Sequence, residues 1–436
     1  MKLFPDDLLH FLENSPTAVH TAAEAAHRLE GAGFRELHEK DAWELKPGDA
    51  FFVRRGGGSL AAGIVGQKAP AEVGLRLVGA HTDVPALRVK PRGVYSKEGY
   101  RMLGVEVYGE PILATWFDRD LTLAGVLVAS KNFGPLQYIP VSLKRPVARI
   151  ANCAIHLNRK VNEEYKVNKQ KHLPAIYALD RKQEMDDQSL RCLLAEAAGI
   201  NEAAVQDYMV DLVDTQPPTL GGLEDDFLFA RGIDNLVSCH AAIWALIETK
   251  DDETPTTRIA VLFDNEEVGS NTFRGAGSTL MDAVIERLCL GYDGGREGML
   301  RTVARSVLVS VDGAHAVHPN YAGQHDANFK PQLGGGPTIK VNANERYATT
   351  AATRTYLTMV AEGADIPLQQ YVHRSDLPCG STIGPISATR LGVATVDVGV
   401  PMLSMHSIRE TTTVADCQYL AEMLGAHFTA GIDPVF

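Results

Sequence analysis

The chain has 436 residues, of which 45% are hydrophobic, so it is long enough to form more than one globular unit with a sizeable core. Its 42 Lys and Arg residues stand against 54 Asp and Glu residues, which gives a formal net charge of -12. This acidic balance, without a long basic run, argues against nucleic acid as a partner, because a phosphate backbone is bound by clustered cations.

The N-terminal residues 1–15 are acidic and amphipathic, whereas an export signal has a short, positively charged segment followed by an apolar core. No uninterrupted run of about 18 apolar residues occurs, so we expect no membrane-spanning helix and no membrane partner. The six cysteines are scattered and form no CxxC pair, which is typical of reduced thiols in the cytoplasm. We therefore expect a cytoplasmic protein.

The first predicted elements along the chain are a helix and a hairpin. Residues 15–31 begin with Ser-Pro, repeat apolar residues at helical spacing and end on glycine, which predicts a helix. Further on, 51–55 and 60–65 flank three consecutive glycines. No helix follows these glycines, so they indicate a hairpin and not a phosphate-binding loop.

Four short apolar runs rich in Val, Ile and Leu have the composition of strands that are covered on both faces. They lie at 75–80, 259–263, 307–311 and 395–400. Helical stretches, such as 236–247 and 278–288, lie between them. This alternation predicts an α/β domain in which helices flank a mixed, mostly parallel sheet.

The stretch 91–223 has a different character, with alternating strand-like segments and one predicted helix. The predicted strands are 105–108, 124–129, 141–150 and 205–213, and the helix is 190–198. Breaker-rich segments at 90–93 and 216–222 flank the stretch. We therefore predict a smaller, β-rich inserted domain at 91–223, and a main domain made of 1–90 and 224–436.

Polar residues follow the predicted strands, at the ends where ligands bind in open α/β sheets. His81 follows the first strand directly, and Asp83 lies two residues on, where its carboxylate could fix the imidazole ring. Glu266 and Glu267 follow the second strand, where an acidic pair is costly unless a cation or hydrogen bonds hold it. Adjacent carboxylates suit a division of labour in which one binds a metal and the other accepts a proton.

Three further residues occupy similar places. Asp312 follows the third strand, His406 lies just past the fourth, and Asp234 opens a helix, although aspartate is also an ordinary helix cap. Together, two histidines and three carboxylates from five distant segments suit two zinc-like ions about 3.5 to 4 Å apart. His315 and His318 follow Asp312 at helical spacing and leave a rival ligand pair open.

Five motifs, in one order along the chain, carry a family resemblance: His81-Thr82-Asp83, Gly232-Ile233-Asp234-Asn235-Leu236, 263–270, 312–321 and Met405-His406-Ser407-Ile408-Arg409-Glu410. They closely resemble the motifs of the aspartyl aminopeptidase family of dinuclear zinc exopeptidases. Segments 115–121, 154–159 and 379–385 extend the resemblance nearly end to end. One departure is Asn265, where many relatives have histidine, and it affects none of the expected ligands.

The resemblance implies a hydrolase that removes the N-terminal residue, preferentially Asp or Glu, from peptides with a free N-terminus. It implies a zinc exopeptidase-like fold, and two divalent ions per subunit, most readily Zn²⁺, although such ligands also accept Co²⁺ or Mn²⁺. Glu266 would be the general base that takes a proton from the attacking water. The implied ligands are Asp234 as the bridge, His81 and Asp312 for one ion, and Glu267 and His406 for the other.

The resemblance also implies how the substrate is recognised and how the chain assembles. Lys340 is the candidate cation for an acidic substrate side chain, with Tyr347 and His315 as helpers. In relatives the inserted domain dimerises the chain, so His156 would enter the partner's active site and stabilise the developing oxyanion. The family also forms dodecamers, and we expect a homo-oligomer.

Three alternatives stay open on the sequence. The first is a family member with a broader or leucine-like preference. The second is a dinuclear amidohydrolase of N-acyl amino acids, which would recognise a free carboxylate in place of the amine. The third is a non-catalytic protein that kept the fold, although all five expected ligands and the expected base are present.

Overall fold

The computed structural model describes residues 4–130, 134–180, 186–292 and 294–432. The chain divides into two compact units. The main unit consists of Met1–Asp83, Thr219–Met405 and Glu410–Phe436, and the inserted unit of Val84–Pro218 and His406–Arg409. The inserted unit thus begins at Val84 and ends at Pro218, where the sequence suggested 91–223, and it also takes in a short segment from near the end of the chain.

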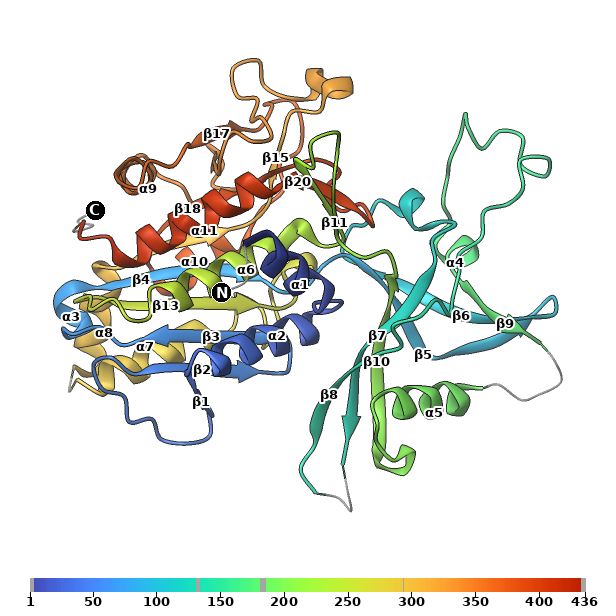
Figure 1. Cartoon of the computed structure of the whole chain (residues 1–436), viewed down its shortest axis with the longest axis horizontal. Helices are drawn as coiled ribbons and strands as arrows, with labels where there is room; N and C mark the ends of the chain where they lie inside the picture. Colours follow the sequence, from blue (N-terminus) through green and yellow to red (C-terminus); the bar gives the residue numbers. More distant parts are fainter. Residues whose placement is uncertain (1–3, 131–133, 181–185, 293, 433–436) are drawn as a thin grey trace. The chain divides into compact units, whose positions relative to one another are not determined.

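The main unit contains a nine-stranded sheet in the order β1-β2-β3-β13-β4-β14-β18-β16-β17 (Figure 1). The strands are β1 (Arg35–Leu37), β2 (Ala50–Arg55), β3 (Ser59–Ile64), β4 (Leu75–His81), β13 (Thr257–Phe263), β14 (Val307–Val311), β16 (Thr338–Val341), β17 (Gln369–Val372) and β18 (Ala394–Gly399). The central strands β13, β4, β14 and β18 run parallel and are almost entirely buried. The predicted α/β class, with a mixed and mostly parallel sheet, is confirmed.

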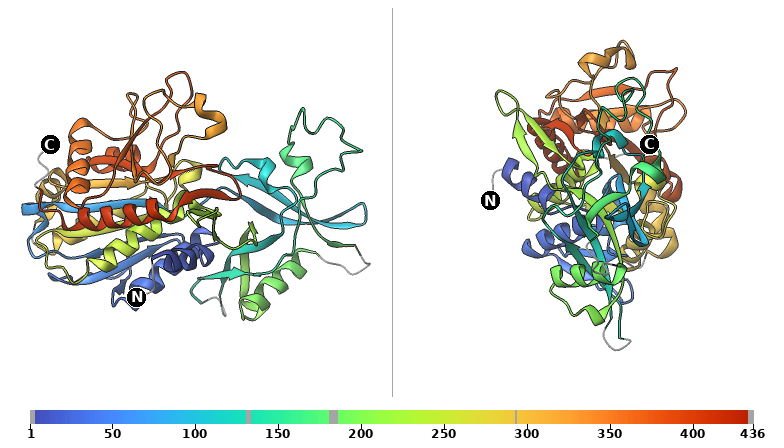
Figure 2. Two further views of the ribbon diagram at one scale, coloured as in Figure 1. Left: turned by 45° about the horizontal axis from the view of Figure 1, so that its top comes forward. Right: turned by 90° about the vertical axis from the view of Figure 1, so that its right-hand side faces the viewer.

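Helices cover both faces of this sheet (Figures 1 and 2). One layer contains α1 (Phe4–Glu13), α2 (Ala18–Gly31), α6 (Ile233–Glu248) and α11 (Val414–Thr429), and α9 (Ala351–Gly363) packs against α11. The other layer contains α3 (Pro70–Val73), α7 (Leu280–Leu290), α8 (Gly295–Ala304) and α10 (Ile383–Leu391). Apolar side chains of α7 and α10, such as Leu280, Ile285 and Ile383, join those of β4 and β13 in one buried core. Because both faces are covered in this way, the central strands can consist of apolar residues throughout.

Two small sheets complete the main unit. One consists of β11 (Thr219–Gly221), β12 (Phe227–Ala230) and β20 (Glu410–Thr413), and the other pairs β15 (Ala314–His315) with β19 (Pro401–Met402). The predicted hairpin is present, because β2 and β3 pair antiparallel across the three glycines. No helix in the described part of the chain is long and apolar enough to cross a membrane.

The inserted unit is built on a six-stranded antiparallel sheet in the order β8-β7-β10-β5-β6-β9. The strands are β5 (Ala86–Lys97), β6 (Tyr100–Tyr108), β7 (Leu121–Ala129), β8 (Gln137–Ser142), β9 (Ala175–Leu179) and β10 (Val205–Asp214), with α4 (Lys169–His172) and α5 (Asp187–Ala197). Leu87, Leu127 and Leu212 from the sheet pack with Leu190 of α5 in a separate core. The expected β-rich character of the insertion is therefore observed.

The predicted strand at 141–150 is wrong. β8 ends at Ser142, and beyond it Ala148 pairs with Leu121 through an isolated bridge. Lys144 has a positive φ of 55°, which turns the chain, and Pro146 has no N–H to donate to a ladder.

The segment 90–93 also differs from expectation, because it does not interrupt the chain between two domains. It lies inside β5, where the register against β6 shifts between Val89 and Val94. The extra residues form an irregularity of the bulge type, and Arg92 takes a positive φ of 53° there. Proline and glycine in this segment therefore mark a bend within a strand and not a linker.

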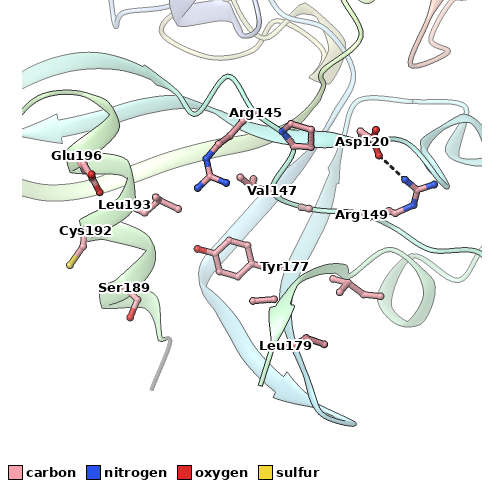
Figure 3. A pocket seen from close by; sticks show the side chains of 14 residues that line it. Asp120, Arg145, Val147, Arg149, Tyr177, Leu179, Ser189, Cys192, Leu193 and Glu196 are labelled. Carbon is pink, nitrogen blue, oxygen red and sulfur yellow. Dashed lines mark hydrogen bonds and ion pairs between the residues drawn. The ribbon is translucent and has the colours of Figure 1, made fainter. Parts of the chain in front are cut away.

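The inserted unit holds a pocket of about 780 Å³ between α5, β9 and residues 145–149 (Figure 3). Its wall includes Arg145 and Tyr177, and an ion pair joins Arg149 to Asp120 at 2.6 Å. The clusters of metal-type ligands found among the described residues lie elsewhere. The pocket therefore does not coincide with the chemistry that the sequence predicts.

Candidate metal centre

His81 is the last residue of β4 and is 1% exposed. Its Nδ1 donates to the backbone carbonyl of Asp83 at 2.9 Å, which places the proton on Nδ1 and leaves Nε2 as the nitrogen suited to a metal. The Asp83 carboxylate is 3.6 Å from Nδ1, too far for the hydrogen bond that the sequence suggested. It accepts instead from the backbone N–H groups of Glu266 and Glu267, each at 3.1 Å. Asp83 thus ties the two glutamates to the segment that carries His81.

Carboxylates from three other segments surround Nε2 of His81. The distances are 3.5 Å to Asp234 Oδ1, 3.6 Å to Asp312 Oδ1 and 4.0 Å to Glu266 Oε2. Ligand atoms of His81, Asp234 and Asp312 lie within 4.8 Å of one another, and so do those of His81, Glu266 and Glu267. Five of the predicted site residues therefore meet within the main unit.

Each of these residues is placed by the end of a regular element. Asp312 directly follows β14. Asp234 lies in the first turn of α6, where its backbone is not yet helical, and its N–H donates to Glu410 Oε2 at 3.0 Å. Glu266 and Glu267 form a short 3₁₀ turn after β13, which Asn265 enters with a left-handed φ of 64°. Asparagine tolerates this conformation better than most residues, which explains locally why asparagine is suitable at position 265.

The electrostatics of the cluster call for a cation. Burial alone would lower the pKa of His81, but the Asp234 and Asp312 carboxylates outweigh it and raise that pKa well above its usual value. Burial, with the charges of Asp312, Asp83 and Asp234, raises the pKa of Glu266 to about 8 against the opposing charge of His81. Neighbouring carboxylates in a buried cluster repel one another, and a divalent ion would stabilise them. Imidazole and carboxylate ligands match the donor set of zinc.

His406 and His156 belong to the inserted unit. His406 has a left-handed φ of 66°, and its Nδ1 donates to the backbone carbonyl of Glu110 at 3.0 Å, so Nε2 is the nitrogen suited to a metal. His156 lies in an exposed turn. Neither residue is among the five that meet within the main unit.

Lys340 is buried at 2% exposure on β16, which excludes a solvated strand lysine. Its Nζ donates to the Gly313 carbonyl at 3.1 Å, lies 3.5 Å from Asp312 Oδ2 and stands 5.1 Å from the centre of the Tyr347 ring. Burial and the charge of Lys340 lower the pKa of His315 to about 4, so this imidazole is neutral near pH 7. Lys340 and Tyr347 thus lie directly beside a predicted metal ligand.

The rival ligand pair of His315 and His318 gains no support. Neither histidine belongs to a cluster of metal-type ligands among the residues that the structure describes. His318 Nδ1 accepts from the backbone N–H of Asn320 at 3.1 Å, and its ring packs against Tyr321. His318 therefore has a structural role at the start of a turn.

Sequence reasoning missed several residues that support the centre. Glu410 holds the Asp234 amide, and Asn235 Nδ2 donates to the Val311 carbonyl at 2.7 Å, which ties α6 to β14. Asp397, fully buried on β18, accepts from Ala348 N and Thr382 Oγ1 beside Lys340. An aspartate inside an otherwise apolar strand was the available signal for Asp397.

The family model for the aminopeptidase I zinc metalloproteases (M18) matches residues 11–428. The chain belongs to the M18 family of zinc aminopeptidases, the aspartyl aminopeptidase family. It is 45% identical over 427 residues to probable M18 family aminopeptidase 2 of Pseudomonas aeruginosa, covering 97% of both chains. The corresponding protein of Pseudomonas syringae pv. tomato is 43% identical over 427 residues, again covering 97% of both chains.

Solved structures extend the likeness of this M18 chain to three dimensions. The Ape4 chain in its complex with Nbr1 matches with a TM-score of 0.94 and 36% identity, covering 98% of this chain and 85% of the other. The prApe1 structure matches at 0.92 and 28%, covering 98% and 93%. The mApe1 dodecamer of S. cerevisiae matches at 0.85 and 27%, covering 97% and 95%. The M18 fold therefore spans both units of the chain.

Proposed function

We propose that this M18 aminopeptidase removes N-terminal Asp or Glu from peptides, with two divalent ions and with Glu266 as the general base. The carrying observation is that His81 meets carboxylates from three other segments at 3.5 to 4.0 Å from its Nε2 atom. Such a buried, acidic cluster at the carboxyl ends of parallel strands has the donors and the charge that divalent ions require.

Asp234 would be shared by the two ions, because its carboxylate belongs to one group of ligand atoms with His81 and Asp312 and to another with Glu267. Glu267 and His406 would complete the second set of ligands, with Nε2 of His406 as donor. Two bound ions would supply Lewis acidity and lower the pKa of a water molecule to near neutrality.

Glu266 is suited to proton transfer. Its N–H is anchored by Asp83, and its carboxylate stands at 4.0 Å from the ligand nitrogen of His81, beside the ligands. Burial raises the pKa of Glu266 to about 8 without ions, and the positive charge of bound ions would lower it toward the range in which a carboxylate first accepts a proton and then returns it. Glu266 would accept the proton of the attacking water and pass it to the amine that leaves.

Lys340 would select the acidic residue. It is a buried cation 3.5 Å from Asp312, so a substrate held at the ions brings its side chain near Nζ. A charge-assisted contact with a substrate carboxylate contributes about 1.5–3 kcal/mol, enough to favour Asp and Glu over leucine by tenfold or more.

Initial rates on the p-nitroanilides of Asp, Glu and Leu, and on N-acetyl-Asp p-nitroanilide, test this function. We expect fast release from Asp and Glu, slow release from Leu and none from the acetylated compound. Comparable rates on Leu would establish the broader specificity, and release of acetate from N-acetyl-aspartate, whose α-carboxylate is free, would establish an amidohydrolase.

Glu266→Gln tests the general base. We expect the variant to bind as much zinc as the native enzyme, with turnover lower by about two to four orders of magnitude. Glu253→Gln, which changes an exposed glutamate of the main unit, is the matched control. Native turnover by a fully zinc-loaded Glu266→Gln variant would remove Glu266 from this role.

We also propose that the enzyme acts in the cytoplasm as a homo-oligomer of dimers, extending to a dodecamer like that of mApe1. Its six cysteines are free thiols, which supports a reducing compartment. In such an assembly the exposed His156 would reach a neighbouring active site. His156→Phe should then lower turnover without loss of zinc, whereas His27→Phe, at another exposed histidine, should not. Equal rates for both variants would exclude the role of His156.

A further inference from the structure

A second, smaller pocket lies in the main unit, just beyond the carboxyl ends of the neighbouring parallel strands β16 and β17. Its volume is about 360 Å³, within the range of sites that bind small molecules or peptide side chains. Its wall is formed by residues 342–344 and 346, which follow β16, and by residues 372–375 and 377–379, which include and follow the end of β17. In open α/β sheets this edge is where ligands bind.

The wall of this pocket is cationic. It includes two arginines, Arg346 and Arg374, together with polar groups of Asn342, Asn344 and Ser375, and no Asp or Glu. Arg374 is held by Asp376 at 2.7 Å and by the carbonyl of Gly323. The Arg346 side chain has no hydrogen bond or ion pair within the described part of the chain and is exposed. Its guanidinium is therefore available to an anion.

Two side chains connect the pocket with the metal centre. Cys379 lines the pocket, and its side chain contributes, after burial, to raising the pKa of the neighbouring Tyr347 hydroxyl. The Tyr347 ring lies beneath Lys340 Nζ at 5.1 Å, and Lys340 in turn lies 3.5 Å from Asp312. A peptide whose first residue is held at the ions and Lys340 therefore has a cationic pocket within reach of its following residues.

We propose that this pocket binds a carboxylate of the peptide substrate beyond the residue that is removed, with Arg346 as its principal partner. The proposal rests on the proposed function, because it takes the first residue to lie between the ions and Lys340. The ligand is an acidic side chain at the second or third position, or the C-terminal carboxylate of a short peptide. Arginine suits this role, because its planar guanidinium matches a carboxylate with two hydrogen bonds.

The experiment compares three substrates with the same first residue: Asp-Ala-Ala-Ala amide, Asp-Glu-Ala-Ala amide and Asp-Ala-Ala with a free C-terminus. Release of aspartate is measured for the native enzyme and for Arg346→Gln, Arg346→Lys and Arg296→Gln. Arg296, an exposed arginine at the start of α8 that lines neither pocket, is the matched control. The quantity of interest is the ratio of kcat/KM for each acidic peptide to that for the neutral amide.

We expect this ratio to be about ten or more for at least one acidic peptide in the native enzyme and the Arg296→Gln variant, as one charge-assisted contact implies. Arg346→Gln should bring the ratio close to one through KM, and Arg346→Lys should restore part of it. A ratio near one in the native enzyme, or an equal ratio in Arg346→Gln, would overturn the proposal.

Sulfate distinguishes a substrate carboxylate from a separate anion. If sulfate changes the rate on Asp p-nitroanilide in the native enzyme but not in Arg346→Gln, while the peptide ratios stay near one, the pocket binds a free anion and the proposal is overturned. If sulfate instead competes with the acidic peptides alone, the proposal is supported.

Failure of the zinc-loaded native enzyme to cleave any of the Asp peptides would refute the proposed function itself. Calorimetric titration of sulfate into native and Arg346→Gln enzyme would still report on the pocket.

Discussion

Asp397→Asn would remove a buried negative charge at a point where several segments meet around Lys340. Asp397 is fully buried on β18, and the register of β16 against β18 places it opposite Lys340. Its two oxygens accept from Ala348 N at 2.6 Å and from Thr382 Oγ1 at 2.7 Å. Burial raises the pKa of Asp397, while the charge of Lys340 and these hydrogen bonds oppose the rise.

The size of the effect follows from what the substitution leaves behind. An asparagine oxygen can still accept from Ala348, and its amide can face the Thr382 hydroxyl, so the hydrogen bonds are largely kept. The charge is not kept, and charge-assisted hydrogen bonds contribute about 1.5–3 kcal/mol against about 0.5–1.5 kcal/mol for neutral ones. Because burial already raises the pKa of Asp397 and Lys340 keeps its ion pair with Asp312 at 3.5 Å, we expect a loss of about 1–2 kcal/mol of unfolding free energy.

Urea denaturation of the metal-free protein measures this change. Asp282→Asn, which breaks a partly exposed pair with Arg390 at 2.7 Å, is the control and should cost less than about 1 kcal/mol. A loss for Asp397→Asn no larger than that of the control would refute the reasoning. In the native-like fraction, the preference for Asp over Leu p-nitroanilide should also fall, because Lys340 and the chain next to Tyr347 lose a common anchor.

Gly384→Ala should destabilise the protein by about 1–3 kcal/mol in the same assay, because a Cβ there would lie 2.3 Å from the Asp397 carboxylate; native stability would show that this contact relaxes freely. Burial and the charge of Arg76 lower the pKa of His427 from 6.5 to about 3. The unfolded chain therefore binds a proton below about pH 6.5 that the native state does not, so stability is full above this pH and falls by about 2 kcal/mol by about pH 5. His427→Gln should reduce the difference in unfolding free energy between pH 7 and pH 5 by that amount, and an unchanged difference would contradict the shift. Asp83→Asn should weaken zinc binding about 10–100-fold, measured by competition with a chelator, and native affinity would show that Asp83 does not orient the centre.

The central strands could be predicted from the sequence because both of their faces are covered, so their composition alone reveals them. The runs at 75–80 and 307–311 correspond closely to β4 and β14. The prediction of a strand at 141–150 was wrong for a different reason. Its alternation suggests a half-buried strand, but Lys144 with its positive φ and Pro146 end the ladder after Ser142.

The sequence predicted that the site residues lie close together, because the carboxyl ends of parallel strands lie at the same edge of a sheet. His81 and Asp312 follow adjacent strands, so their proximity is a consequence of the order of β4 and β14 in the sheet. The contact between Asp234 and Glu410 could not be foreseen, because it joins residues 176 positions apart through a side chain and a backbone amide. The hydrogen bond of the Asp83 carboxylate with Glu266 was also not predicted. Asp83 lies only two residues from His81, so the sequence suggested a contact with the imidazole ring instead.

In the proposed function, the charges of the centre would connect metal binding with the preference for an acidic first residue. Asp234, Asp312, Glu266 and Glu267 carry four negative charges when ionised, which two divalent ions would balance. Without the ions, Lys340 is one of the cations that Asp312 has within reach, and burial together with the neighbouring carboxylates raises the pKa of Glu266 to about 8. With the ions bound, Asp312 would be neutralised by the metal, and the positive charge of Lys340 would attract an incoming carboxylate. The preference for an acidic first residue would therefore depend on metal loading as well as on Lys340 itself.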